Sequence, residues 1–290
     1  MEGQLLMVYI FYNTDIIPYY SLIIFLLGLC IGSFLNVCIW RIPRGESVVF
    51  TPSHCPECNK EILWYDNLPV LSWIMLSGKC RWCGGKISIR YIGIELLTAV
   101  LFEIDYLRIV DMKLPLSMLL SYFVATSLFV VCSFTDIKHK IIPNKVTYFV
   151  IIFSLIMAFI FPGYTGKNTR VFGLLNSFLG FVAGGGTFAL FSFAGRKIFK
   201  KEVLGFGDVK FMAAVGACFG LVPAVWFFVI FIGSFLGLIF GVFLILLGEK
   251  HFSSEIKFGP FLAIAGYLWI LLGPELIDFY FKMIINYFVA

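Results

Sequence analysis

Two aspartates at the ends of apolar segments are the residues of this sequence best placed to do chemistry. Asp136 closes one apolar run, in Ser-Phe-Thr-Asp-Ile-Lys-His-Lys, and Asp208 opens another, in Leu-Gly-Phe-Gly-Asp-Val-Lys-Phe. Carboxylates beside lipid are costly and usually functional. Two carboxylates that share one proton can divide the work of hydrolysis, because one acts as base on water while the other donates to the scissile carbonyl.

Each aspartate also has a purely structural interpretation. Asp136 could pair with a lysine that follows it, and Asp208 could cap the N-terminus of its own helix. Gly205 and Gly207 remove side chains beside Asp208, which would let another backbone come close. Because both aspartates are expected at one depth, where they can face each other across a helix bundle, we predict a catalytic pair.

The position of each aspartate also predicts which one holds the shared proton. Asp208 is expected at a helix N-terminus, where the helix dipole favours the ionised form of a carboxylate. Asp136 is expected near a helix C-terminus, where the dipole favours the protonated form. On these grounds Asp208 is the expected base.

Four cysteines form a second candidate site. Cys55 and Cys58 make one Cys-x-x-Cys pair, and Cys80 and Cys83 make another after a gap of 21 residues. Two such pairs can complete a tetrahedral zinc site, and the spacing resembles that of zinc ribbons. The alternative is thiol–disulfide chemistry, which needs an oxidising compartment. The other four cysteines lie in apolar segments and are expected to be inert packing residues.

The composition shows which elements must position these groups. Of the 290 residues, 60% are hydrophobic and 13% are charged, whereas a soluble domain has about 45–50% apolar and about 25% charged residues. A membrane-spanning helix needs about 20 mostly apolar residues. We therefore predict an all-α polytopic membrane protein with about eight transmembrane helices, at residues 19–40, 91–108, 114–134, 142–161, 173–195, 208–221, 224–247 and 259–281.

The distribution of Lys and Arg predicts the orientation. With the N-terminus outside, the inside segments hold 16 Lys and Arg and the outside segments hold 5, as expected when cytoplasmic loops carry the positive charge. Both aspartates and the cysteine cluster are then on the cytoplasmic side, where disulfides are rare. The net charge of +5 forms no basic stripe, which argues against nucleic-acid binding.

The segment between the first two helices departs from the lipid-like composition. Residues 41–90 contain the four clustered cysteines, four prolines and scattered charge. About fifty residues cannot build much core unaided, so a metal is expected to hold them. The predicted division is therefore an N-terminal segment with the first helix (1–40), a cytoplasmic zinc-binding insert (41–90) and a transmembrane core that carries both aspartates (91–290).

These motifs, taken in order, resemble the type IV prepilin peptidases, a family of membrane aspartic proteases with a Gly-x-Gly-Asp motif. The resemblance extends from about Gly28 to Tyr267. It is carried by the first-helix signature at 32–43, the insert at 53–58, 67–73 and 80–84, the entry into the second helix at 87–98, the aspartate segments at 135–144 and 205–210, and a late motif, Phe-Gly-Pro-Phe-Leu-Ala, at 258–263.

The resemblance implies a function for the aspartates. Family members cleave the leader peptides of prepilins or pseudopilins, in type IV pilus or type II secretion systems, at the cytoplasmic face of the bacterial inner membrane. Members with the cysteine-bearing insert also commonly methylate the new N-terminus with S-adenosylmethionine. The sequence has no glycine-rich cofactor fingerprint of the soluble kind, so no residue is assigned to that donor.

Two other classes of protein remain as alternatives. A transporter using Asp136 and Asp208 for ion coupling would need polar residues near the middle of the bilayer, and the predicted segments have few. A non-catalytic, zinc-stapled assembly protein of a pilus or secretion machine would need no carboxylate pair at all. Substitution of either aspartate separates the assembly protein from the peptidase, because the assembly protein would keep its function without that carboxylate. The transporter differs from both because it would move a solute.

Overall fold

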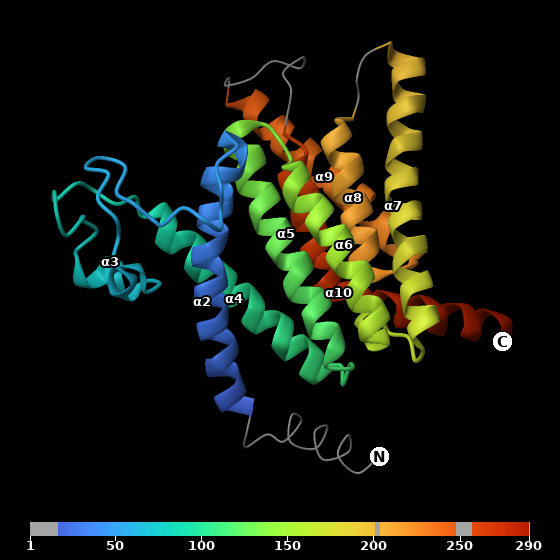
Figure 1. Cartoon of the computed structure of the whole chain (residues 1–290). Helices are drawn as coiled ribbons and strands as arrows, with labels where there is room; N and C mark the ends of the chain where they lie inside the picture. Colours follow the sequence, from blue (N-terminus) through green and yellow to red (C-terminus); the bar gives the residue numbers. More distant parts are fainter. Residues whose placement is uncertain (1–16, 201–203, 248–256, 290) are drawn as a thin grey trace. The chain divides into compact units, whose positions relative to one another are not determined.

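The computed structural model describes residues 17–200, 204–247 and 257–289, and these residues are mainly helical (Figure 1). They contain no β-strand, only two isolated β-bridges. The all-α class predicted from the sequence is therefore confirmed. The N-terminal segment before Ile17 and parts of two loops predicted to be cytoplasmic, 201–203 and 248–256, lie outside the described residues.

The helices follow the predicted apolar segments, with shifted ends. The α-helices are α2 (Ile17–Arg41), α3 (Leu71–Met75), α4 (Arg90–Asp111), α5 (Ser117–His139), α6 (Asn144–Ile160), α7 (Arg170–Phe199), α8 (Phe206–Phe219), α9 (Pro223–Leu246) and α10 (Gly259–Val289). Three short 3-10 helices join them: η1 (Ile42–Arg44), η2 (Trp64–Asn67) and η3 (Pro162–Thr165).

Four helical stretches in the described part of the chain are long and apolar enough to cross a membrane. They are Ile17–Arg44, Ser117–His139, Pro162–Ile198 and Val225–Leu246. Two further apolar stretches are shorter, namely α6 (Asn144–Ile160) and the first part of α10 (Gly259–Gly273). The apolar composition of the sequence thus agrees with the presence of helices that are long and apolar enough to span a membrane. The count of eight spans stays a prediction.

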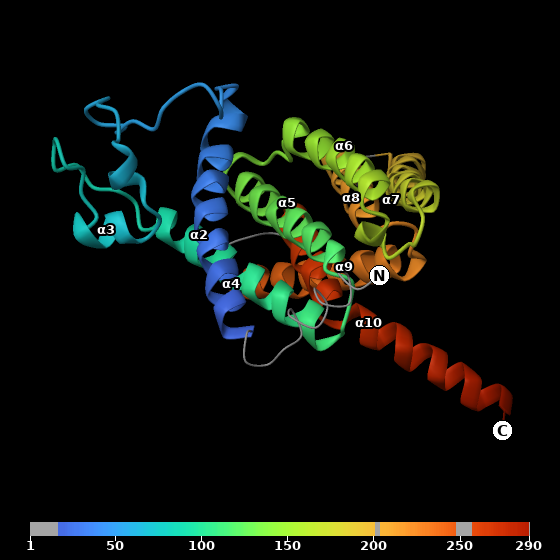
Figure 2. The same ribbon diagram turned by 60° about the horizontal axis from the view of Figure 1, so that its bottom comes forward.

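The chain divides into two compact units, one ending at Leu114 and the other beginning at Pro115. In the first unit α2 packs against α4 (Figures 1 and 2). Gly28 and Gly32, spaced as in a Gly-x-x-x-Gly motif, allow this contact. A Cβ at Gly28 would lie 2.5 Å from the Cα of Ala99, and one at Gly32 would lie 2.7 Å from the Cα of Glu95.

In the second unit α8 is the central helix, because it packs against α5, α6 and α7. Being enclosed on several sides explains why this short helix is apolar nearly all round. Two glycines set its distance from α7: a Cβ at Gly180 would lie 2.2 Å from the Gly216 oxygen, and one at Gly216 would lie 2.1 Å from the Gly180 oxygen. α10 packs against α5 and α9.

Candidate active site and candidate metal site

The four clustered cysteines lie on two loops with the same local structure. In the first loop the Cys55 N–H donates to Lys60 and the Asn59 N–H donates back to Cys55. In the second loop Cys80 and Gly84 repeat this pattern at equivalent positions. Both Asn59 and Gly84 have positive φ, 55° and 71°, a conformation that suits Gly and Asn. An isolated β-bridge closes each loop, His54–Glu61 and Lys79–Lys86.

The structure brings the four thiols together. The Sγ atoms of Cys55, Cys58, Cys80 and Cys83 all lie within 4.8 Å of one another, and those of Cys55 and Cys83 are 3.8 Å apart. Four sulfurs around a tetrahedral ion at the usual zinc–sulfur distance would stand about 3.8 Å apart. The cluster can therefore hold a metal ion of that size.

The backbone of the second loop also prepares a thiol for metal binding. Hydrogen bonds from the backbone amides of Cys83 and Trp82 lower the pKa of the Cys80 thiol to about 7. The Gly85 amide lowers the pKa of the Cys83 thiol, but burial and the neighbouring thiols outweigh it and raise this pKa to about 12. The thiolate is the form that binds metal. A donor set of four thiols, one of them with a lowered pKa, suits a soft or borderline cation such as zinc.

Two buried charged residues, to which the sequence analysis assigned no role, anchor the insert to the helices that flank it. At the end of α2, Arg41 donates to the backbone oxygens of Thr51 (2.6 Å) and Pro52 (2.9 Å). On α4, Glu95 accepts the N–H of Val70 at 2.8 Å. Val70 has φ of 62°, which is strained for a β-branched residue. This carboxylate stabilises that strained turn.

The second unit holds Asp136 and Asp208. Asp136 lies in the last turn of α5 and Asp208 in the first turn of α8, and both are buried, with 8% and 9% of their surface exposed. The two carboxylates are close enough to interact electrostatically. Cys132, one turn earlier on α5, lies near both of them. Residues 72 positions apart in the sequence are thus brought into one site.

The start of α8 explains how Asp208 is held. Gly205 is the N-cap and Asp208 is the third residue of the helix. The Asp208 N–H donates to the Gly205 oxygen at 3.0 Å, and the Asp208 carboxylate accepts a hydrogen bond from the Gly205 backbone. The contact of the carboxylate with the N-cap backbone is one half of a capping box, because Gly205 has no side chain to supply the other half. A Cβ at Gly207 would lie 3.1 Å from the Cβ of Ile142, so this residue sits in a tight space.

Three residues to which the sequence analysis gave no role lie around the pair. Gly259, the first residue of α10, donates its N–H to the Asp136 Oδ2 at 3.2 Å. Lys257 donates to the Ile137 oxygen at the end of α5. On the other side, Lys210 donates to the Asn144 Oδ1 at 2.9 Å and so ties α8 to α6. The only available signal was that these residues lie in or beside the quoted motifs.

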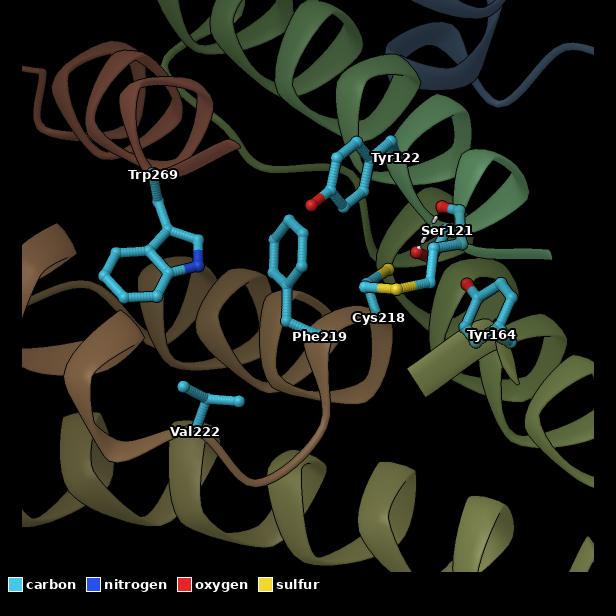
Figure 3. A pocket seen from close by; sticks show the side chains of 8 residues that line it. Ser121, Tyr122, Tyr164, Cys218, Phe219, Val222 and Trp269 are labelled. Carbon is cyan, nitrogen blue, oxygen red and sulfur yellow. Dashed lines mark hydrogen bonds between the residues drawn. The ribbon is translucent and has the colours of Figure 1, made fainter. Parts of the chain in front are cut away.

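A cavity of about 310 Å³ lies at the opposite end of the second unit (Figure 3). Tyr122 of α5, Phe219 of α8 and Trp269 of α10 line it, with polar atoms from Ser121 and Tyr164. Ser121 precedes Asp136 by 15 residues on one helix, which corresponds to about 22 Å along the axis. The cavity is therefore separate from the aspartates.

Two family models match the chain. The model of the bacterial peptidase A24 N-terminal domain matches residues 26–109, which include the four cysteines. The model of the type IV leader peptidase family matches residues 122–242, which include Asp136 and Asp208. Lys257 and Gly259 lie beyond both matches. No solved structure matches this chain.

Curated relatives are similar over most of the chain. A "Prepilin leader peptidase/N-methyltransferase" of Aeromonas salmonicida (strain A449) is 33% identical, over 92% of this chain and 95% of its own length. One of Bacillus subtilis (strain 168) is 31% identical, over 90% of this chain and 98% of its own. One of Myxococcus xanthus is 38% identical, over 69% of this chain and 56% of its own. The chain therefore belongs to the type IV leader peptidase family.

Proposed function

We propose that this protein is a membrane aspartic endopeptidase that cleaves the leader peptides of prepilins or pseudopilins and then methylates the new N-terminus. Family membership and the names of the relatives support both activities. The observation that carries the peptidase assignment is the meeting of two buried carboxylates, Asp136 and Asp208, at the ends of packed helices. Neither the assembly-protein nor the transporter alternative requires this arrangement.

The proposed chemistry follows from the pairing of the carboxylates. Two buried carboxylates that interact electrostatically do not both ionise readily, so one keeps a proton. The ionised member takes a proton from water as the water oxygen attacks the scissile carbonyl, and the protonated member donates to the carbonyl oxygen. Burial strengthens both interactions, because water is largely excluded.

The proposed topology places this chemistry at the inner edge of the membrane. With eight spans and the N-terminus outside, the end of α5 and the start of α8 are at the cytoplasmic face. A prepilin has a basic leader followed by an apolar helix, so its helix can lie in the bilayer while the leader junction reaches the aspartates. Gly205 leaves little side-chain bulk near Asp208, which suits an extended substrate backbone, while the space beside Gly207 is taken by Ile142. We propose the bacterial inner membrane as the location.

We propose zinc as the metal of the insert, with Cys55, Cys58, Cys80 and Cys83 as its ligands. Four protein ligands leave no open position, so the ion would be structural and would hold the two cysteine loops together. In the methyl-transfer step S-adenosylmethionine supplies the methyl group. We assign no residue of this chain to that donor.

We also propose that the chain has three functional parts: the N-terminal segment with the first helix (1–40), the zinc-binding insert (41–90) and the transmembrane peptidase core (91–290).

The test is cleavage of a purified prepilin by the full-length protein, followed by mass spectrometry. We expect Asp136→Ala and Asp208→Ala each to lower the rate about 10³-fold or more, because each removes one of the two proton-transfer groups. A product of the wild type that carries an added methyl mass, only when S-adenosylmethionine is present, would support the second activity.

The matched control is Asp278→Ala, which removes an exposed carboxylate of α10 paired with Lys282. Thermal unfolding and metal content should be the same for all variants. If Asp136→Ala or Asp208→Ala cuts at nearly the wild-type rate, the two-aspartate mechanism is wrong and the assembly-protein interpretation returns.

A further inference from the structure

The segment that leads into α10 meets the end of α5 at the catalytic pair. The N–H of Gly259 donates to the Asp136 Oδ2 at 3.2 Å. The ammonium of Lys257 donates to the backbone oxygen of Ile137, the residue after Asp136, and is close enough to interact with the Asp136 carboxylate. One hydrogen bond and one positive charge from the same short segment therefore act on one aspartate.

The fit around Gly259 leaves no space for a side chain. A Cβ added there would lie 2.8 Å from the Asp136 Oδ2 and 3.2 Å from its carboxyl carbon. A real Cβ essentially never comes within 3.0 Å of another heavy atom, so a larger residue would push the carboxylate away. The backbone of α10 thus approaches Asp136 closely enough to hydrogen-bond to it only because this residue is glycine.

These contacts make the two aspartates unequal. Asp136 lies in the last turn of its own helix, where the helix dipole would disfavour a negative charge. Lys257 binds one of the carbonyl oxygens at that end and brings a full positive charge, while the first N–H of α10 points at the carboxylate. Hydrogen bonding and an opposite charge both favour the ionised form.

Asp208 has a different environment. It accepts a hydrogen bond from the Gly205 backbone, and the charged group that acts on it is Asp136 itself. Both aspartates thus meet the N-terminus of a helix, α8 for Asp208 and α10 for Asp136. A full positive charge distinguishes Asp136, and a negative neighbour disfavours the ionised form of Asp208.

We propose that Lys257 and Gly259 are positioning residues that keep Asp136 ionised, so that Asp208 carries the shared proton before cleavage. This inference rests on the proposed peptidase function and reverses the order expected from the sequence, where Asp208 was the expected base. The reversal comes from a neighbour 121 residues further along the chain than Asp136.

The reaction balances with this assignment. Asp136 takes a proton from water as the water oxygen bonds to the scissile carbon, and Asp208 gives its proton to the carbonyl oxygen. When the carbon–nitrogen bond breaks, Asp136 returns its proton to the leaving amine and Asp208 takes one from a hydroxyl of the intermediate. Both aspartates then have their starting protonation.

The first experiment measures how kcat/KM for prepilin cleavage depends on pH, with full-length protein in lipid nanodiscs. Among the titratable groups around Asp136, Lys257 before α10 interacts with its carboxylate, and Asp208 on α8 and Cys132 on its own helix lie close enough to be influenced by its charge. Since the acid limb of this profile reports ionisation of the base, losing the Lys257 charge in Lys257→Met should move that limb to higher pH. Loss of one nearby charge is expected to shift the limb by about one pH unit. At pH values below the limb, kcat/KM of Lys257→Met should therefore be about tenfold lower than that of the wild type.

Two control variants separate this role from a purely structural one. Lys257→Arg keeps the charge and should restore the wild-type profile. Lys145→Met removes an exposed lysine near the start of α6 and should leave the profile unchanged. If Lys257→Met unfolds, Lys257→Gln takes its place. A profile with an unmoved acid limb in the folded variant, whatever its height, would overturn the proposal.

A second variant tests the glycine. Gly259→Ala should lower kcat more than it raises KM, because its Cβ displaces Asp136 without touching the bulk of the substrate. Gly186→Ala is the matched control, since a Cβ at that helical position meets nothing within 4 Å. Wild-type kcat in Gly259→Ala would contradict the proposal. If Asp136→Ala and Asp208→Ala are inactive but the Lys257 variants keep the wild-type profile, only this inference fails and the peptidase function stands.

Discussion

The cysteine cluster and the aspartate pair are built in opposite ways. The four cysteines lie within 29 consecutive residues, and each loop is closed by hydrogen bonds between near neighbours in the sequence. The two aspartates come from helices 72 residues apart, and α8 reaches its place only by packing against α5, α6 and α7. The first site therefore depends on local sequence and on the metal we propose for it, and the second depends on close helix packing.

Burial shows the same contrast. In residues 42–89, all of which the structure describes, the buried residues are Cys55, Ser72, Gly78 and Cys80, and none is a large apolar side chain. In α8 most residues are buried, among them Phe211 and Met212, which are fully enclosed. A segment without an apolar core needs another source of stability, such as a bound metal. Helix α8 is stabilised by its own buried apolar side chains.

The largest expected effect is that of removing the metal. Stripping it with a chelator should unfold residues 42–89 and leave the second unit folded. Structural zinc sites of this kind bind with an apparent free energy of about 10–16 kcal/mol, which exceeds what this insert can gain from burial. Limited proteolysis should then cut only within the insert.

Two cysteine variants sharpen this test. Cys80→Ser should behave like the chelated protein, because a three-thiol site holds zinc less tightly. Cys30→Ser, at an exposed position of α2, should not. An insert that resists protease equally well with and without metal would contradict the contrast between the two sites.

The second prediction breaks the packing that carries Asp208. In Gly216→Val the new side chain would collide with the Gly180 oxygen, which a Cβ alone would approach to 2.1 Å. Overpacking typically costs 1–3 kcal/mol, and a clash with backbone should reach about 3 kcal/mol. We expect a lower unfolding temperature and loss of cleavage, because α8 positions Asp208, while metal content stays the same.

Gly186→Ala is again the control, since it adds a methyl group to α7 where a Cβ has open space. Its unfolding free energy should stay the same or rise by up to about 1 kcal/mol, because alanine favours a helix interior over glycine. Equal stability of Gly216→Val and Gly186→Ala would show that the contact between α7 and α8 is looser than its distances indicate.

The sequence was sufficient to predict features formed by residues close together in the chain. It was insufficient to predict contacts between residues far apart in the chain. The spacing of Cys55, Cys58, Cys80 and Cys83 predicted their clustering, because a Cys-x-x-Cys turn is local chemistry. The same is true of the start of α10 at Gly259, where a Gly-Pro pair marks the boundary. The contact of Lys257 and Gly259 with the end of α5 could not be predicted, since no local pattern specifies which helix ends meet.

Helix ends show the same limit on a smaller scale. The predicted segment 173–195 became α7 (Arg170–Phe199), because the Thr169 hydroxyl accepts the Phe172 N–H and starts the helix earlier. The predicted start at Asp208 became Phe206, with Gly205 as the N-cap. Hydropathy reports which residues face lipid or core, whereas caps are set by single hydrogen bonds.

The smallest expected effect concerns the ion pair between the second cysteine loop and η2. Arg81 donates to both oxygens of Asp66, at 2.5 and 2.7 Å, and holds the pKa of this carboxyl below its usual value. The lowered pKa stabilises the folded insert when the pH is above the ordinary carboxyl pKa of about 3.9. This stabilisation is lost as the pH falls through the lowered value.

At pH 7 the insert of Arg81→Gln should therefore open slightly more often than the insert of the wild type, measured as faster amide exchange at residues 64–67. The difference between the two proteins should shrink in acid. Lys86→Gln removes an equal charge from the same insert without an ion pair to Asp66, so equal exchange rates in the two variants at pH 7 would mean that the pair contributes nothing.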